Sequence, residues 1–258
     1  MEVEALKNKD KLKHSFILKK STAAFANALR RTMINEVPAM AIESVEIKKN
    51  SGIQYDEMIA HRLGLVVLKT DLKSYNLPEK CTCKGEGCAQ CQLKLILKAK
   101  GPGYVYAGDL KSEDPKCNPI HEKTIITKLL KNQELELIAT ATLGQGKKHT
   151  KWSPCLAYYK HPAIIDIKNN NNADETAKLC PVNVFENKNG KLAIKDQNAC
   201  HLCLACEENG DVKISEKKDS FMFTIESWGQ LDPKVIAKKS TDIINDKCND
   251  FIEKVKDK

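Results

Sequence analysis

Eight of the eleven cysteines in this 258-residue chain fall into two tight groups, and cysteine thiolates are strong metal ligands. The first group is Cys81, Cys83, Cys88 and Cys91. The second group is Cys180, Cys200, Cys203 and Cys206. The charged N-terminal residues resemble no secretion signal, and the longest aliphatic run is too short to cross a membrane, so we expect a cytoplasmic protein without membrane contact. In a reducing cytoplasm, clustered thiols indicate metal sites rather than structural disulfides.

The first group places four thiols within eleven residues, in the pattern Cys-x-Cys-x4-Cys-x2-Cys. Gly85 and Gly87 lie between the two pairs and allow the loop to bend back, so that both pairs can face one ion. Four thiolates with no open position are typical of a structural zinc site, and we expect one zinc ion here. The alternatives are a reduced loop without metal and a pair of redox-active disulfides.

The second group has the spacing Cys-x2-Cys-x2-Cys, which is the three-cysteine core of a bacterial-ferredoxin cluster motif. In that motif a further cysteine precedes a proline, and Cys180-Pro181 supplies this feature from upstream. The pattern predicts one iron–sulfur cluster, with [4Fe–4S] ahead of [3Fe–4S]. The alternative is a second zinc site, although thiols two residues apart suit the corners of a cubane better than a tetrahedral ion.

Signals for catalysis are missing from the sequence. Gly144-Gln145-Gly146-Lys147 lacks the earlier glycine and the closing hydroxyl residue of a phosphate-binding loop. No closely spaced acidic triad could hold two magnesium ions for nucleotidyl transfer. The net charge of +8 is modest and scattered, so direct sequence-specific DNA binding is not expected. We therefore expect no catalytic residues.

Helices and strands alternate along the chain in a mixed order that predicts an α+β fold. Ser21 or Thr22 can cap a helix that continues to about Glu36, and Asp232-Pro233 can start a long final helix with one apolar stripe. Strands are expected at 14–19, 42–48, 92–99, 104–107, 134–142 and 221–226, and a further helix at 120–130. Because a long terminal helix with one apolar face needs a partner surface, its stripe indicates packing against a core or a second chain.

Residues 164–212 differ in composition from the rest of the chain. They carry eight acidic and five basic side chains, whereas the whole chain is basic, and they contain the second cysteine group. This shift indicates an inserted subdomain.

Four motifs in order resemble the alpha-like subunits of multisubunit RNA polymerases. The first is FANALRRTMINEVP at 25–38, followed by AIESV at 41–45. The others are Asp56-Glu57 with AHRLGL at 60–65, the Gly-x-Gly-Lys-x-His-x-Lys-Trp-x-Pro pattern at 144–154, and Phe-x-Ile-Glu-Ser-x-Gly-x-Leu at 223–231. The ferredoxin-like insert makes the chain similar to the archaeal members of this family, the archaeal D subunits.

This resemblance implies a fold and a set of partners. It implies a dimerisation domain from residues 1–40 plus 216–258, and an insert domain at 41–215 that holds the zinc loop 81–91 and the cluster subdomain 164–212. Members of the family do no chemistry themselves and belong to an enzyme only as subunits of the nucleotidyltransferase complex. They pair with a small alpha-like subunit, subunit L, and the pair is a platform for the two large catalytic subunits. The expected partner-facing residues are Phe25, Leu29, Met33, Ile244, Phe251 and Ile252.

Two other classes of protein compete with this interpretation. A free single-cluster electron-transfer protein would also carry the second cysteine group, although the chain has no flavin or nicotinamide fingerprint and much sequence outside the cluster region. A zinc-dependent nucleic-acid binder would need a clustered basic stripe, which is missing. Co-purification with large polymerase subunits would distinguish the family's function from electron transfer.

Overall fold

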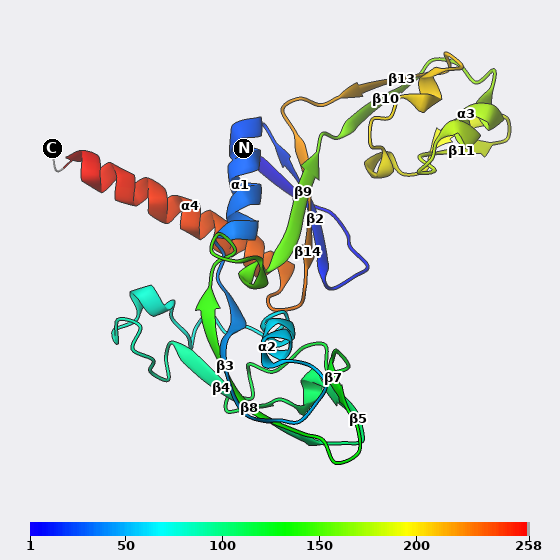
Figure 1. Cartoon of the computed structure of the whole chain (residues 1–258). Coiled ribbons are helices and arrows are strands. Elements are labelled where there is room, and N and C mark those ends of the chain that lie inside the picture. The colour runs from blue at the N-terminus through cyan, green and yellow to red at the C-terminus, as the bar shows by residue number, and fades with distance from the viewer. Residues whose placement is uncertain (257–258) are drawn as a thin grey trace. The chain divides into compact units, whose positions relative to one another are not determined.

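The structure is a computed structural model that describes residues 1–256, and its elements are labelled in Figure 1. The helices are α1 (Ala23–Asn35), α2 (Asp56–Gly64), α3 (Ala173–Leu179) and α4 (Pro233–Lys256). The strands are β1 (Glu2–Ala5), β2 (Lys13–Lys19), β3 (Ala39–Asn50), β4 (Gln92–Lys100), β5 (Gly103–Tyr106), β6 (Lys111–Ser112), β7 (Ile125–Leu129), β8 (Glu134–Gly144), β9 (Cys155–Lys160), β10 (Ala163–Ile167), β11 (Phe185–Lys188), β12 (Lys191–Ile194), β13 (Val212–Glu216) and β14 (Phe221–Ser227). The predicted mixture of helices and strands is confirmed.

The chain forms two compact units, each assembled from separated segments. Unit 1 consists of Met1–Lys9, Ser15–Ala28 and Tyr158–Thr224. Unit 2 consists of Asp10–His14, Leu29–Ala157 and the residues from 225 onward. Residues 257 and 258, the end of the predicted segment 216–258, lie outside the described residues.

Aromatic side chains form the centre of unit 1. They come from a four-stranded sheet with the order β1-β2-β14-β9. Phe16 of β2 stacks on Phe223 of β14, with ring centroids 5.1 Å apart and planes 5° from parallel. Tyr159 of β9 meets the ring of Phe221 edge-on at 5.4 Å. Offset and edge-on aromatic pairs add stability beyond the area that they bury, so these contacts fix the pairing of the strands.

The rest of unit 1 is a small subdomain that contains the second cysteine group. Strands β10 and β13 pair antiparallel from Ala163↔Glu216 to Ile167↔Val212, and β11 and β12 form a hairpin. The turn of this hairpin is Asn189-Gly190, with φ of 55° and 80°. Positive φ at both central residues is the geometry that matches the twist of a two-residue hairpin, and Asn-Gly adopts it readily.

Unit 2 is built around an antiparallel sheet with the order β3-β8-β4-β6. Strand β8 lies between β3 and β4, so that Ala139 pairs with Val45 on one side and with Leu95 on the other. Every second residue of β8 is buried, and helix α2 inserts Ile59 and Leu63 into the same core. The sheet therefore has one face in the core, which holds β4 and the loop before it firmly.

The two predicted helix starts are confirmed. Thr22 caps α1, because its hydroxyl oxygen accepts a hydrogen bond from the Phe25 backbone N–H at 3.3 Å. Asp232 does the same for α4, accepting from the Lys234 N–H at 2.8 Å. Only Pro233, Ile236 and Ser240 of α4 are buried in this chain, so the second half of this 24-residue helix has no core of its own.

The predicted helix at 120–130 is wrong. Residues 125–129 form strand β7, which pairs with β5, and the residues before them form a loop. The segment contains four consecutive β-branched residues, Thr124 to Thr127, which favour a strand. A register shift between Val105 and Tyr106 of β5 marks a bulge, and Ile126 and Thr127 are both buried. The bulge removes the simple alternation by which a strand is recognised.

Close packing at the end of β8 gives a testable expectation. A Cβ atom on Gly144 would lie 2.3 Å from the indole ring of Trp152, whose Nε1–H donates to the Thr142 carbonyl at 3.2 Å. We expect Gly144→Ala to lower the free energy of unfolding by about 1–3 kcal/mol through overpacking. The matched control is Gly64→Ala, because a Cβ there has only ordinary contacts. Thermal unfolding would measure both variants, and equal stability would contradict the tight contact.

Candidate metal centres

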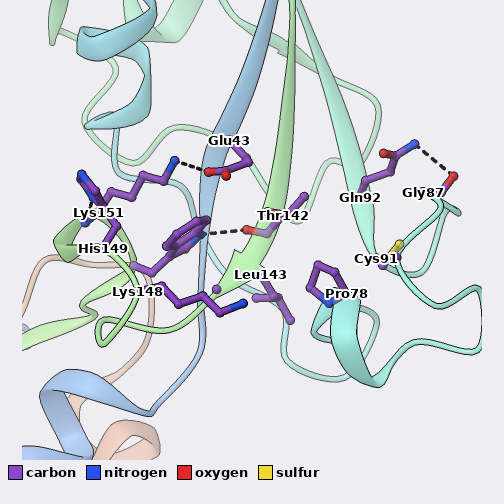
Figure 2. Close-up of a pocket in the computed structure, with 13 residues that line it drawn as sticks. Glu43, Pro78, Gly87, Cys91, Gln92, Thr142, Leu143, Lys148, His149 and Lys151 are labelled. Carbon is purple, nitrogen blue, oxygen red and sulfur yellow. Dashed lines mark hydrogen bonds and ion pairs between the residues drawn. The ribbon is translucent and has the colours of Figure 1, made fainter.

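The first cysteine group lies on the loop that leads into β4. The short 3₁₀ helix η1 (Pro78–Lys80) precedes Cys81, and β4 begins directly after Cys91. The Asn76 N–H donates to the Gln90 carbonyl at 2.8 Å, so the ends of the loop are joined. Gln92 Nε2 donates to the Gly87 carbonyl at 3.2 Å, as Figure 2 shows, and ties the middle of the loop to the strand. The loop is therefore anchored on the rigid sheet of unit 2.

The four thiols of this loop converge on one point. The Sγ atoms of Cys81 and Cys88 are 3.5 Å apart, as are those of Cys83 and Cys91, and Cys88 and Cys91 are separated by 3.8 Å. All four sulfur atoms lie within 4.8 Å of one another. A tetrahedral zinc ion with Zn–S bonds of about 2.3 Å places its sulfur ligands about 3.8 Å apart. The donor set and its spacing fit a single tetrahedral ion.

Backbone groups of the loop favour the thiolate form of Cys83. The N–H of Gly87, and then that of Gly85, donate to its sulfur and lower the pKa of this thiol. Both glycines have positive φ, 97° and 89°, which turns their N–H groups toward the sulfur. Thiolate is the form that binds metals, so the expected role of these glycines in bending the loop has a second, electrostatic part.

A cleft of about 500 Å³ lies beside the loop, between it and residues 148–152 (Figure 2). Its basic side chains already have partners in the chain. Lys148 pairs with Glu79, and Lys151 pairs with Glu43 and lies over the Trp152 ring at 4.4 Å. Both lysines of the cleft lining are therefore paired within the chain.

The second cysteine group gathers in the small subdomain of unit 1. Cys180 directly follows α3, and Cys200 directly follows the 3₁₀ helix η4 (Gln197–Ala199). Cys206 lies within the 3₁₀ helix η5 (Ala205–Glu207). These three thiols are buried, whereas Cys203 is exposed. Cys180, Cys200 and Cys206 belong to one apolar cluster, so the subdomain brings the distant Cys180 to the cysteine loop.

The four thiols of the second group are neighbours but are spaced more widely than those of the first. Burial raises the pKa of the Cys206 thiol to about 11, and negative charge on the other three sulfurs raises it too. Within residues 1–256, the first group is the only set in which three or more ligand atoms of His, Cys, Asp or Glu lie within 4.8 Å of one another. A cubane takes one thiolate on each of four separate irons, so it needs a wider set of sulfurs than a single zinc ion does. The second group therefore differs from the first in the spacing of its thiols.

The backbone around Cys203 has an unusual conformation. Leu202 and Leu204 both adopt the left-handed region, with φ of 62° and 63°. Bulky residues rarely do so, because the Cβ atom approaches the carbonyl oxygen. Left-handed residues are one component of backbone nests, the concave sets of N–H groups that bind phosphates and iron–sulfur clusters.

Asp211 positions helix α3, which Cys180 directly follows, and sequence reasoning missed this residue. This carboxylate is buried and accepts hydrogen bonds from the Asn172 N–H at 2.8 Å and from the Thr176 hydroxyl at 3.5 Å. It therefore joins the start of α3 to the chain just beyond Cys206. No local sequence pattern marks this role, because the partners lie 35 or more residues away.

The six predicted partner-facing residues have different environments. Phe251 and Ile252 are 69% and 48% exposed, and Phe25 and Ile244 are partly exposed. Leu29 and Met33 are buried within this chain, at 4% and 0% exposure. These two side chains belong to the chain's own core and are not available on its surface. Part of the apolar stripe of α1 thus packs inside this chain.

The structure also bears on a membrane location. Within residues 1–256, none of the helices combines the length and the apolar character that crossing a bilayer requires.

Comparison with known proteins identifies relatives over the whole chain. The family model described as "RNA polymerase Rpb3/RpoA insert domain" matches residues 45–154. "DNA-directed RNA polymerase subunit Rpo3" of Archaeoglobus fulgidus is 38% identical over 262 residues, which cover 98% of each chain. The protein of the same name from Methanothermobacter thermautotrophicus is 38% identical over 256 residues, covering 96% of this chain and 97% of the relative.

A eukaryotic relative extends the comparison. "DNA-directed RNA polymerase II subunit rpb3" of Dictyostelium discoideum is 35% identical over 270 residues, covering 92% of this chain and 89% of the relative. Identity at this level over nearly complete chains establishes common descent, and it agrees with the four motifs. The chain belongs to the Rpo3/Rpb3 family of DNA-directed RNA polymerase subunits.

Proposed function

We propose that this protein is a non-catalytic assembly subunit of a cytoplasmic DNA-dependent RNA polymerase, equivalent to the archaeal D subunit. It pairs with a small alpha-like subunit, subunit L, and the pair is the platform for the two large catalytic subunits. The pairing surface belongs to a dimerisation domain from residues 1–40 plus 216–258. The intervening insert domain, 41–215, holds both metal centres.

The exposed apolar stripe of α4 carries this proposal. Ile244, Cys248, Phe251, Ile252 and Val255 recur at helical spacing, and each is at least partly exposed. An amphipathic helix normally buries such a stripe, and contiguous exposed apolar patches mark interaction sites. The nearby Lys247 pairs with Glu36 at 2.5 Å, which connects α4 to the residue just beyond α1. The partly exposed Phe25 of α1 belongs to the proposed partner-facing residues as well.

We assign one zinc ion to Cys81, Cys83, Cys88 and Cys91. The sulfur spacing supports a closed structural site, in which zinc holds the loop and takes no part in a reaction. We assign one iron–sulfur cluster, [4Fe–4S] ahead of [3Fe–4S], to Cys180, Cys200, Cys203 and Cys206. The wider thiol spacing and the left-handed residues of the loop support this assignment. The cluster folds the subdomain 164–212, whose apolar core is small.

A free electron-transfer protein remains the second candidate, and the partial exposure of its cluster loop favours it. Cys203 is exposed, and exposure near a partner is what electron transfer requires. Purification of the native complex decides between the two functions. Large polymerase subunits that co-purify with this chain support the assembly role, whereas a stable complex with a reductase alone would refute it.

The proposed pairing surface predicts that Phe251 contributes to the affinity of the heterodimer. We expect Phe251→Ala with Ile252→Ala to weaken the heterodimer by at least about 2 kcal/mol, roughly thirtyfold in Kd, because aromatic anchors dominate such interfaces. Isothermal titration with the purified alpha-like partner measures this change. Glu253→Ala, on the opposite side of α4, is the matched control and should bind normally. Unchanged affinity of the double variant would place the interface elsewhere.

Metal content tests the zinc loop. A variant in which Ser replaces the four cysteines of the second group should still hold about one zinc per chain by elemental analysis. Adding Cys88→Ser should remove this zinc and expose residues 76–91 to proteases. Adding Cys248→Ser instead, at an exposed thiol on α4, should leave the zinc in place. Free alkylation of the four loop thiols in native protein would contradict the assignment.

Removal of the cluster should unfold one part of the chain only. We expect Cys203→Ser with Cys206→Ser to abolish the iron chromophore and to make residues 164–212 sensitive to limited proteolysis. Pairing with the alpha-like partner should survive, since α4 lies outside this segment. An iron-free variant with an unchanged digestion pattern would show that the cluster does not stabilise the subdomain.

A further inference from the structure

Lys160 occupies a position between the central sheet of unit 1 and the cysteine subdomain. It is the last residue of β9, and two residues separate it from the start of β10. Its side chain leaves the strand and is partly buried. Within residues 1–256 it forms no ion pair by direct contact with a carboxylate. No carboxylate contacts this partly buried ammonium group directly, but Asp196 and Cys200 lie close enough to interact with its charge.

The ammonium group instead binds the main chain ahead of the cysteine loop. Lys160 Nζ donates to the Asn198 carbonyl at 2.6 Å and to the Cys200 carbonyl at 2.7 Å. Both are short, charge-assisted hydrogen bonds, which are stronger than those between neutral groups. The second acceptor belongs to a proposed cluster ligand itself.

A second side chain holds the same turn from the other direction. Gln197 Nε2 donates to the Ala163 carbonyl at 2.6 Å, at the first residue of β10. The turn η4 is therefore fixed to the segment 160–163 by two side chains, one reaching in each direction. With its carbonyl held, Cys200 has a defined backbone orientation, and this orientation decides where its thiol points.

The charge of Lys160 also suits the proposed ligand. An iron–sulfur cluster held by four thiolates is anionic, and its stability and reduction potential depend on nearby charge and hydrogen bonds. Groups that orient a metal ligand typically change metal affinity by about 10–100-fold when they are removed. A cation bound at the carbonyl of one ligand can therefore orient that ligand and also change the stability and reduction potential of the cluster.

We infer that Lys160 is a positioning residue for the cluster: it fixes the backbone of Cys200 to strand β9 and places a positive charge beside the cluster. This inference rests on the proposed cluster. It makes the cluster loop an extension of the aromatic-centred sheet, because Tyr159, the neighbour of Lys160, packs against Phe221.

The experiment uses the full chain, purified without oxygen. Lys160→Met keeps the length of the side chain but removes the charge and both hydrogen bonds, whereas Lys160→Arg keeps a cation. We expect the Met variant to lose iron to a chelator about tenfold faster than the wild type, and the Arg variant to recover much of this difference. The cluster that remains in the Met variant should have a more negative midpoint potential, which loss of packing alone would not produce.

Two further variants complete the test. Lys213→Met, at an exposed position on β13 of the same subdomain, is the matched control and should behave as the wild type. Gln197→Ala should also speed iron loss, and it reports on the same turn if Lys160→Met fails to fold. Equal iron loss and equal potentials in Lys160→Met and Lys213→Met would overturn the inference about Lys160 but not the proposed cluster. A wild-type chain that takes up no iron would overturn the proposed cluster and the inference together.

Discussion

Thiol groups attract one another only weakly, so a shared cation is the interaction that would hold the four converging sulfur atoms of the first loop together. In the first loop the neighbouring sulfur atoms lie 3.5–3.8 Å apart, which is close to the spacing of sulfur ligands around one tetrahedral ion. Only a shared cation makes such proximity favourable once the thiols lose their protons. The proposed metals would therefore stabilise the two cysteine segments, whereas the sheets around them are stabilised by ordinary apolar packing.

The two centres differ in how their surroundings supply rigidity. The first loop is attached to β4, a strand with apolar residues on one face in the core of unit 2. The second group has a small core and relies on long-range polar ties instead, from Asp211 to α3 and from Lys160 to the turn before Cys200. Polar ties are directional, so they specify where a thiol points more narrowly than apolar contacts would.

The sequence predicts most elements and the convergence of the first cysteine group well, because each depends on local spacing. It fails where the cause is not local. The strand at 125–129 contains a bulge opposite Tyr106, and its pattern cannot be understood without its partner strand. Leu29 and Met33 lie on the expected stripe of α1, but periodicity does not distinguish a stripe that faces the chain's own core from one that faces a second protein. Lys160 and Asp211 bond to residues far away along the chain, and neither has a sequence motif.

The left-handed leucines of the cluster loop have a consequence for the order of events during maturation. Each such residue costs about 1–2 kcal/mol, so Leu202 and Leu204 together make this loop shape roughly thirtyfold to a thousandfold rarer than relaxed alternatives when nothing is bound. Without the proposed cluster, the chain would seldom hold its loop in this conformation. Insertion of a complete cluster then has to wait for this rare conformation, whereas stepwise capture of iron by one or two thiols does not. For the proposed cluster, the backbone of this loop thus favours stepwise assembly over insertion of a complete cluster.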